Sequence, residues 1–133
     1  AAYVPAVRTG DLLVISGQLP LRAGELLHAG RVPSDVSVEH AREAARQCAL
    51  NALAIIKGEV HGQWVRLRRI VRLGVFVQSD DDFHDQAKVA NGASEFLGEL
   101  LGEDGRHARA AVGVNALPLN ACVELEMMAE LAD

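Results

Sequence analysis

The sequence predicts an α+β fold of order ββαβαββ, in which two helices pack on one face of a β-sheet. Apolar residues alternate with the two-residue period of strands in several segments and follow helical spacing in two longer ones. Half of the 133 residues are hydrophobic and 23% are charged, which is the balance of a globular protein. No repeat, linker or low-complexity tract divides the chain, so we expect residues 1–133 to form one domain.

The N-terminal segment predicts a β-hairpin. Residues 3–7 and residues 12–18 are the two strands, and they flank a turn in which Gly10 supplies a positive φ. Two prolines and two glycines then predict a loop over residues 20–37, with one short strand at Leu26–Leu27.

The first helix is predicted to start at Val38 and to end at Gly58. Ser37 is a suitable N-cap, and glycine is the residue that most often ends a helix. The stripe expected to face the core is built mostly of small residues, at Ala41, Ala45, Cys48, Ala52 and Ile55. Small side chains let a helix approach a sheet closely, so we expect short helix–sheet contacts here.

Residues 65–77 predict a third strand, with apolar side chains on one parity at Leu67, Val71, Leu73, Val75 and Val77. A second helix is expected to begin near residues 80–82, whose three aspartates favour the positive end of a helix, and to end at Gly102. Its apolar stripe is predicted at Phe83, Ala87, Ala90, Ser94, Leu97 and Leu101.

Residues 110–116 and 121–130 predict two final strands, joined as a hairpin by residues 117–120. The last strand alternates cleanly, with apolar residues on one face at Val123, Leu125, Met127 and Ala129 and three glutamates on the other. We expect the helices to cover the apolar face, to which Ala110, Val112 and Val114 are also assigned. The opposite, half-polar face is either solvated or packed on another subunit, and the periodicity allows both.

Charge and cysteine content exclude several classes of protein. A formal net charge of −5 argues against a non-specific nucleic-acid binder, which needs a basic surface. Cys48 and Cys122 lack C-x-x-C spacing and fit a reducing compartment. No apolar run is long enough to span a membrane and no signal-peptide pattern appears, so we expect a cytoplasmic protein without a membrane partner.

Several common kinds of site are also unsupported. The five histidines lack the spacing of metal ligands, so no metal site is predicted. The serines lack a G-x-S-x-G elbow, and the glycines form no phosphate-binding loop between a strand and a helix. The only basic cluster comprises Arg66, Arg68, Arg69 and Arg72, of which Arg66, Arg68 and Arg72 are expected to share a strand face. A solvated or intersubunit charged face is favoured over an anion site.

Arg109 and Glu124 are the strongest candidates for a functional pair, since both are predicted on the polar face of the C-terminal hairpin. If that hairpin turns near Pro118, Glu124 lies opposite Gly113, and Arg109 is on the order of 13 Å away. A salt bridge within the chain is therefore not expected. Either each residue has another partner, or the two line opposite ends of a small-molecule cleft.

At these residues the sequence resembles the RidA/YjgF family of reactive-intermediate deaminases, and the likeness runs over essentially the whole chain. It is carried by residues 3–7 with Gly10, 13–20, 51–53, 75–77, Asp82-Phe83, 108–112 with Leu117-Pro118, and 123–126. The resemblance implies a chorismate-mutase-like fold with a mixed sheet, a homotrimer, and ligand clefts between subunits.

The resemblance also implies roles for particular residues. Arg109 matches the arginine that binds the substrate carboxylate, and Glu124 matches the glutamate that handles the hydrolytic water. Tyr3, Ser16 and Asn91 match other positions at the cleft. In a 2-imino acid, a planar guanidinium can grip the carboxylate through two N–H groups while a positioned carboxylate assists water at the C=N bond. Such hydrolysis to a 2-oxo acid and ammonia needs no metal or organic cofactor.

The chain departs from the family pattern near its arginine. His107 stands where the family usually has proline, and Ala111 stands where cysteine or serine is frequent. These departures resemble a less characterised branch. Three functions therefore stay open: an imine or enamine deaminase, a non-catalytic trimer that binds a small carboxylate metabolite, and an endoribonuclease, which the negative charge favours least.

Overall fold

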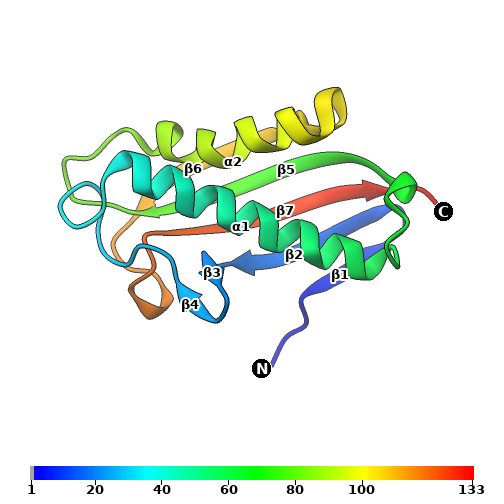
Figure 1. Ribbon diagram of the computed structural model, residues 1–133, viewed down its shortest axis with the longest axis horizontal. Helices are drawn as coiled ribbons and strands as arrows, with labels where there is room; N and C mark the ends of the chain where they lie inside the picture. The colour runs from blue at the N-terminus through cyan, green and yellow to red at the C-terminus, as the bar shows by residue number, and fades with distance from the viewer. Residues whose placement is uncertain (1) are drawn as a thin grey trace.

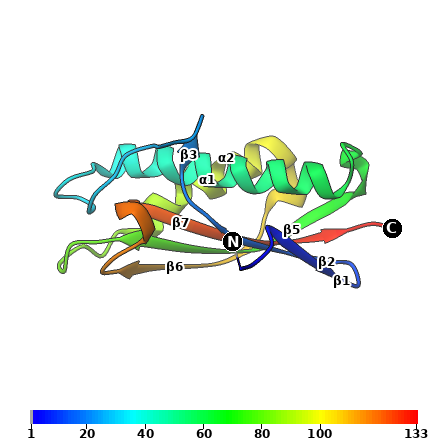
Figure 2. The ribbon, with the colours of Figure 1, turned by 90° about the horizontal axis from the view of Figure 1, so that it is seen from below.

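The computed structural model describes residues 2–133 and consists of a five-stranded mixed sheet with two helices on one face (Figures 1 and 2). The strand order is β1-β2-β7-β5-β6, and all neighbouring strands are antiparallel except β5 and β6. The strands of the sheet are β1 (Ala6–Thr9), β2 (Leu12–Gln18), β5 (Leu67–Gln78), β6 (Ala108–Val114) and β7 (Val123–Leu131). The helices are α1 (Val38–Glu59) and α2 (Gln86–Leu101). The predicted α+β class and the order of its main elements are confirmed.

The predicted N-terminal hairpin forms, with Thr9 paired to Leu12 around a turn in which Gly10 has φ 58°. Its first strand is Ala6–Thr9 rather than residues 3–7. The following loop contains a small antiparallel hairpin, β3 (Leu21–Arg22) and β4 (Glu25–Leu26), rather than the single short strand predicted at Leu26–Leu27.

Helix α1 begins at the predicted cap, where the Ser37 hydroxyl accepts a hydrogen bond of 3.1 Å from the backbone N–H of His40. Its predicted end at Gly58 is wrong, because the helix continues through Glu59. The chain then turns through His61 (φ 53°) and Gly62 (φ 75°). His61 and Gly62 beyond the helix therefore supply the left-handed turn, and Gly58 lies inside the helix.

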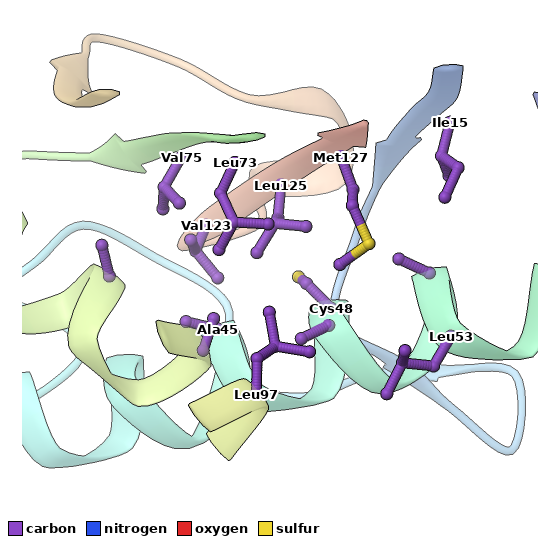
Figure 3. Close-up of a cluster of buried hydrophobic side chains, with 14 of the residues drawn as sticks. Ile15, Ala45, Cys48, Leu53, Leu73, Val75, Leu97, Val123, Leu125 and Met127 are labelled. Atoms are coloured by element: carbon purple, nitrogen blue, oxygen red, sulfur yellow. The ribbon is translucent and has the colours of Figure 1, made fainter. Parts of the chain in front are cut away.

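The core lies between the helices and the sheet, and Figure 3 shows side chains from both layers meeting there. Ala41, Ala45, Cys48 and Ala52 of α1 are fully buried, whereas Ile55 is only partly covered. The alternation predicted for the last strand is confirmed, since its apolar set is at most 1% exposed: Val123, Leu125, Met127 and Ala129. Most of the buried residues of α1 are alanine or cysteine, which explains how a 22-residue helix lies close against the strands.

Helix α2 begins later than predicted, at Gln86 instead of residues 80–82. Asp80 serves another purpose, because its carboxylate accepts hydrogen bonds of 2.8 and 2.9 Å from the backbone N–H and hydroxyl of Ser34. The buried stripe is accordingly rotated from the predicted one, and consists of Val89, Ala90, Ala93 and Leu97. The predicted end at Gly102 is confirmed by its φ of 62°.

The predicted C-terminal hairpin is wrong, because β6 and β7 are not neighbours. Strand β5 lies between them, pairing in parallel with β6 and antiparallel with β7. The chain crosses from one side of β5 to the other through a 3-10 turn at Pro118–Asn120. This topology also reverses the faces predicted for β6: Ala110 and Val112 are exposed, whereas Ala111 packs on the core.

The sheet face opposite the helices, here called the open face, carries paired charges. Two irregularities in the β5–β7 register change the parity of β5, so that Ile70 and Leu73 both face the core. Arg69 pairs with Glu130 at 3.0 Å, and Arg72 pairs with Glu126 at the same distance. The expectation that Arg66, Arg68 and Arg72 share a strand face is wrong, because Trp64–Arg66 forms a 3-10 turn before β5 begins.

Neither helix within residues 2–133 is long and apolar enough to cross a membrane. Cys48 and Cys122 are both buried and free, in agreement with their spacing in the sequence. Burial raises the pKa of the Cys122 thiol to about 11, and burial likewise raises the pKa of Cys48.

Candidate functional site

Arg109 lies on the helix side of the sheet, not on the polar face where the sequence placed it. Its strand partner is Leu73, whose side chain is fully buried beneath the helices. The guanidinium reaches α2, where Nη1 donates to Oδ1 of Asn91 at 2.8 Å and to Oγ of Ser94 at 3.1 Å. Asn91 and Ser94 are three residues apart and therefore share one face of the helix. Asn91, which the resemblance assigns to the cleft, thus lies in contact with Arg109.

These two bonds use both hydrogens of Nη1 and leave the other edge of the guanidinium unpaired. Within residues 2–133, Nε and Nη2 of Arg109 make no hydrogen bond or ion pair. Nε and Nη2 form the fork that can hold both oxygens of a carboxylate. Helix α2 thus fixes the arginine from one side and leaves a two-donor edge for a ligand.

His107 lies two residues before Arg109 on the same chain segment and joins the same network. Its Nδ1 is 2.6 Å from the backbone oxygen of Gly105, and its Nε2 is 2.8 Å from Oγ of Ser94. Ser94 is thus in contact with both His107 and Arg109. Ser94 was predicted only as part of the apolar stripe of the second helix; its position one helical turn after Asn91 is the signal that could have identified it as a site residue.

A groove of about 270 Å³ lies over this network, between α2 and the start of β6. Its lining residues are Ser94, Gly98, Gly105, Arg106, His107 and Arg109. Two arginines and no carboxylate line it, so the groove favours an anionic ligand. Because β6 is an edge strand, the groove opens at a border of the sheet.

Glu124 occupies a different part of the molecule, on the open face. It pairs with Phe76 in the β5–β7 register and alternates with the buried residues of β7. Its carboxylate has no hydrogen bond or ion pair within the described part of the chain. Partial burial, and secondly the neighbouring charge of Glu126, raise the pKa of this carboxyl.

The carboxylate of Glu124 packs against Gly17 of β2. A methyl group added at Gly17 would lie 3.0 Å from Cδ and 3.3 Å from Cγ of Glu124, and closer still to one carboxylate oxygen. A side chain at this position would therefore displace the Glu124 carboxylate from its place. The adjacent residue, Ser16, donates from its hydroxyl to the backbone oxygen of Val4 at 2.7 Å, which ties the N-terminal segment to β2.

The predicted site residues therefore form two groups within one chain. Arg109 and Asn91 lie together at the groove, whereas Glu124 and Ser16 lie on the open face, beside a hollow of about 200 Å³ lined in part by Ser16 and Gly17. Tyr3 is 70% exposed on the segment that Ser16 holds. Two strand spacings and three residues of register separate the backbones of Arg109 and Glu124 by about 14 Å, and their side chains leave opposite faces.

The donor chemistry of neither group suits a metal ion. No cluster of three or more histidine, cysteine, aspartate or glutamate side chains with metal-binding geometry occurs in residues 2–133. The chemistry available is that of a carboxylate-binding arginine, a serine–histidine contact and a carboxyl group of raised pKa.

Comparison with known proteins identifies relatives over nearly the full chain. The Trypanosoma cruzi protein TCP17 is 41% identical over 130 residues, which cover 97% of this chain and 81% of that protein. A crystal structure of Atu1372 from Agrobacterium tumefaciens, a protein of unknown function, is 45% identical with a TM-score of 0.97, and the match covers 99% of this chain and 83% of that one.

A more distant relative carries a named activity. The Escherichia coli protein named 2-iminobutanoate/2-iminopropanoate deaminase is 32% identical over 127 residues, covering 96% of this chain and 85% of its own. The family model described as "YjgF/chorismate_mutase-like, putative endoribonuclease" matches residues 1–131. On the strength of this match and these relatives, the chain belongs to the RidA/YjgF family.

Proposed function

We propose that this protein hydrolyses small reactive 2-imino or enamine acids to 2-oxo acids and ammonia, in a cleft between subunits. The observation that carries the proposal is the guanidinium of Arg109, which α2 holds at Nη1 and whose Nε–Nη2 edge is unpaired above an anion-favouring groove. The Escherichia coli relative named for 2-iminobutanoate and 2-iminopropanoate acts on molecules that carry such a carboxylate, which supports the substrate class.

In this proposal Arg109 holds the substrate carboxylate and Glu124 acts on the attacking water. Burial raises the pKa of Glu124, and a more basic carboxylate is a better acceptor of a water proton near neutral pH. Because Arg109 and Glu124 of one chain leave opposite faces of the sheet, the reaction requires Glu124 of a neighbouring subunit to approach the groove. In the proposal Ser16, which lies beside Gly17 and Glu124, and Tyr3, on the segment that Ser16 ties to β2, complete the substrate pocket.

We further propose that the assembly is a homotrimer that works in the cytoplasm. The open face supports assembly, since it exposes Val14 (37%), Val112 (47%) and partly buried Met128 among its charged pairs. A closed ring of identical subunits places the open face and sheet edge of each against the next one, and so forms the same cleft at every boundary. The two free, buried thiols fit a reducing compartment.

The endoribonuclease activity in the family description is less well supported by this chain. The formal net charge is −5, and the arginines of the basic cluster that lie on the open face are paired, Arg69 with Glu130 and Arg72 with Glu126. Nucleic-acid binding requires a basic surface that is free to contact phosphates.

The first experiment separates binding from turnover at Arg109. Isothermal titration with 2-oxobutanoate, and a coupled assay of freshly generated 2-imino acids, are applied to wild type, Arg109→Lys and Arg109→Ala. Lysine keeps the charge and loses the fork, so both variants are expected to bind 2-oxobutanoate poorly. Retained binding in both would remove Arg109 from the site. Binding by the wild type without imine turnover would identify a metabolite-binding protein instead.

The second experiment tests the subunit boundary with Glu124→Gln, which is expected to keep ligand affinity and to lose about 10²–10⁴-fold in turnover rate. Arg109→Ala and Glu124→Gln chains are then unfolded, mixed in equal amounts and refolded. If a cleft takes its arginine and glutamate from different subunits of a symmetric ring, about a quarter of the clefts regain both. Activity that stays at the level of the separate variants would place both residues in the same subunit. A molar mass of about 14 kDa, measured by light scattering, would exclude the trimer.

A further inference from the structure

The second hydrogen bond of the His107 ring shows which of Ser94 and His107 donates in the contact between them. The backbone oxygen of Gly105 can only accept, so Nδ1 of His107 carries a hydrogen and donates across 2.6 Å. In the neutral imidazole, Nε2 is then an acceptor, and the Ser94 hydroxyl donates to it across 2.8 Å. The same Ser94 oxygen accepts from Nη1 of Arg109 at 3.1 Å.

This arrangement resembles the way a base prepares a hydroxyl for proton transfer. A backbone carbonyl fixes the tautomer and orientation of the imidazole, and the imidazole can take a proton from the hydroxyl. Ser94, His107 and Arg109 all line the groove, so the hydroxyl lies beside any carboxylate held on the free edge of the same guanidinium. Ser94 is partly exposed there, which gives a bound molecule access to its oxygen.

We propose that Ser94 and His107 form a proton relay, which removes the hydroxyl proton of the carbinolamine intermediate when ammonia leaves. This inference rests on the proposed function, and it adds a role that Glu124 alone does not fill. Glu124 takes a proton from water and returns it to nitrogen, whereas the relay takes a proton from oxygen at the other end of the reaction.

The steps balance for a protonated imine. Water adds its oxygen to the C=N carbon, its first proton passes through Glu124 to nitrogen, and the product is a carbinolamine with an ammonium group. The carbinol O–H then gives its proton to Oγ of Ser94 while the proton of Ser94 passes to Nε2 of His107. The C=O bond forms, the C–N bond breaks with its electron pair on nitrogen, and ammonia leaves.

The imidazolium formed in this step passes its proton to solvent through the open groove, which restores the neutral imidazole for the next cycle. His107 acts through Ser94 and is therefore a positioning residue, which keeps Ser94 ready to accept a proton.

The experiment compares steady-state imine hydrolysis by wild type, His107→Gln, His107→Ala and Ser94→Ala, with the exposed His61→Gln as a matched control. We expect kcat to fall about 10²-fold in His107→Gln, with KM and 2-oxobutanoate affinity little changed because the Ser94–Arg109 contact remains. Ser94→Ala is expected to lower kcat and raise KM, since it also removes an acceptor for Arg109. His61→Gln should match the wild type.

Chemical rescue separates a relay from a merely structural histidine. Added imidazole is expected to restore part of kcat in folded His107→Ala and to leave Ser94→Ala unchanged. An active wild type with unaltered kcat in His107→Gln, or with no rescue of His107→Ala, overturns the relay and leaves the deaminase proposal in place. A wild type that hydrolyses no imine overturns the deaminase proposal itself, and the relay with it.

Discussion

Replacement of Gly92 by alanine tests how closely the two helices approach each other. Gly92 of α2 faces the backbone of α1 at Arg42. A methyl group at this position would lie 2.7 Å from the carbonyl carbon and 2.8 Å from Cα of Arg42, and closer still to the carbonyl oxygen. The Arg42 side chain holds this crossing on both sides of Gly92, with bonds of 2.8 Å to the Lys88 backbone oxygen and the Glu95 carboxylate.

The expected magnitude follows from the separation that the methyl group requires. Ordinary contacts begin near 3.4 Å, so the helices must move apart by on the order of 1 Å, and such overpacking costs about 1–3 kcal/mol. Alanine recovers about 1 kcal/mol in helix propensity over glycine. The net change in the free energy of unfolding for Gly92→Ala is therefore a loss of about 0–2 kcal/mol.

Gly98 in the same helix provides the matched control, because a methyl group there meets no atom within 4 Å. Gly98→Ala should gain up to about 1 kcal/mol from propensity alone. Urea denaturation followed by circular dichroism measures both variants, and Gly98→Ala is expected to be the more stable of the two by about 1–3 kcal/mol. Equal stabilisation of Gly92→Ala and Gly98→Ala would show that the close helix crossing is absent and refute the reasoning.

Three further predictions concern the core, the thiols and Glu124. Ala45→Leu and Ala52→Leu should each destabilise the protein by about 1–3 kcal/mol, because both sites are fully buried against the sheet, whereas exposed Ala54→Leu should unfold near the wild-type temperature. Burial raises the pKa of Cys48 and Cys122, so maleimide at neutral pH should label neither thiol until urea unfolds the chain, and rapid labelling of the native protein would contradict their burial. Burial raises the pKa of Glu124 in the folded state, so the folded protein favours the protonated carboxyl group. This contribution to stability is fully present below the ordinary carboxyl pKa of about 4.3. It is lost as pH rises through the higher pKa of the folded state. Glu124→Gln should therefore be more stable than wild type at pH 7, with the difference closing toward pH 4; a wild type that is the more stable at pH 7 would reveal a cation paired with Glu124 across a subunit boundary.

Local patterns in the sequence predicted the structural features that depend only on residues close together in the chain. The strict alternation from Val123 to Glu130 determines which side of β7 is buried, and the Ser37 hydroxyl caps α1 because capping needs only the first turn. Gly102 ends α2 for a similarly local reason.

Pairing between distant segments could not be predicted in the same way. Consecutive strands are neighbours about two-thirds of the time, which favoured a β6–β7 hairpin, but β5 lies between them. This error placed Arg109 on the wrong face of the sheet. The contacts of its guanidinium with Asn91 and Ser94 were missed for the same reason, because only the packing of α2 on β6 creates them. Arg66 was also misplaced, because it lies in a 3-10 turn before β5 rather than on the strand. Within β5 itself, no periodicity shows where the register shifts by one residue.

The position of β7 affects the order in which the fold can form. The last strand in the sequence is the middle strand of the sheet, where it lies between β2 of the N-terminal hairpin and β5 (Figure 1). On a ribosome, most of the chain has emerged before the residues that connect its two halves are made. Until then, β2 and β5 each present an unpaired edge that can pair with other chains. A chain that ends before Val123 should lack a cooperative unfolding transition and should aggregate, whereas one that ends after Leu131 should fold.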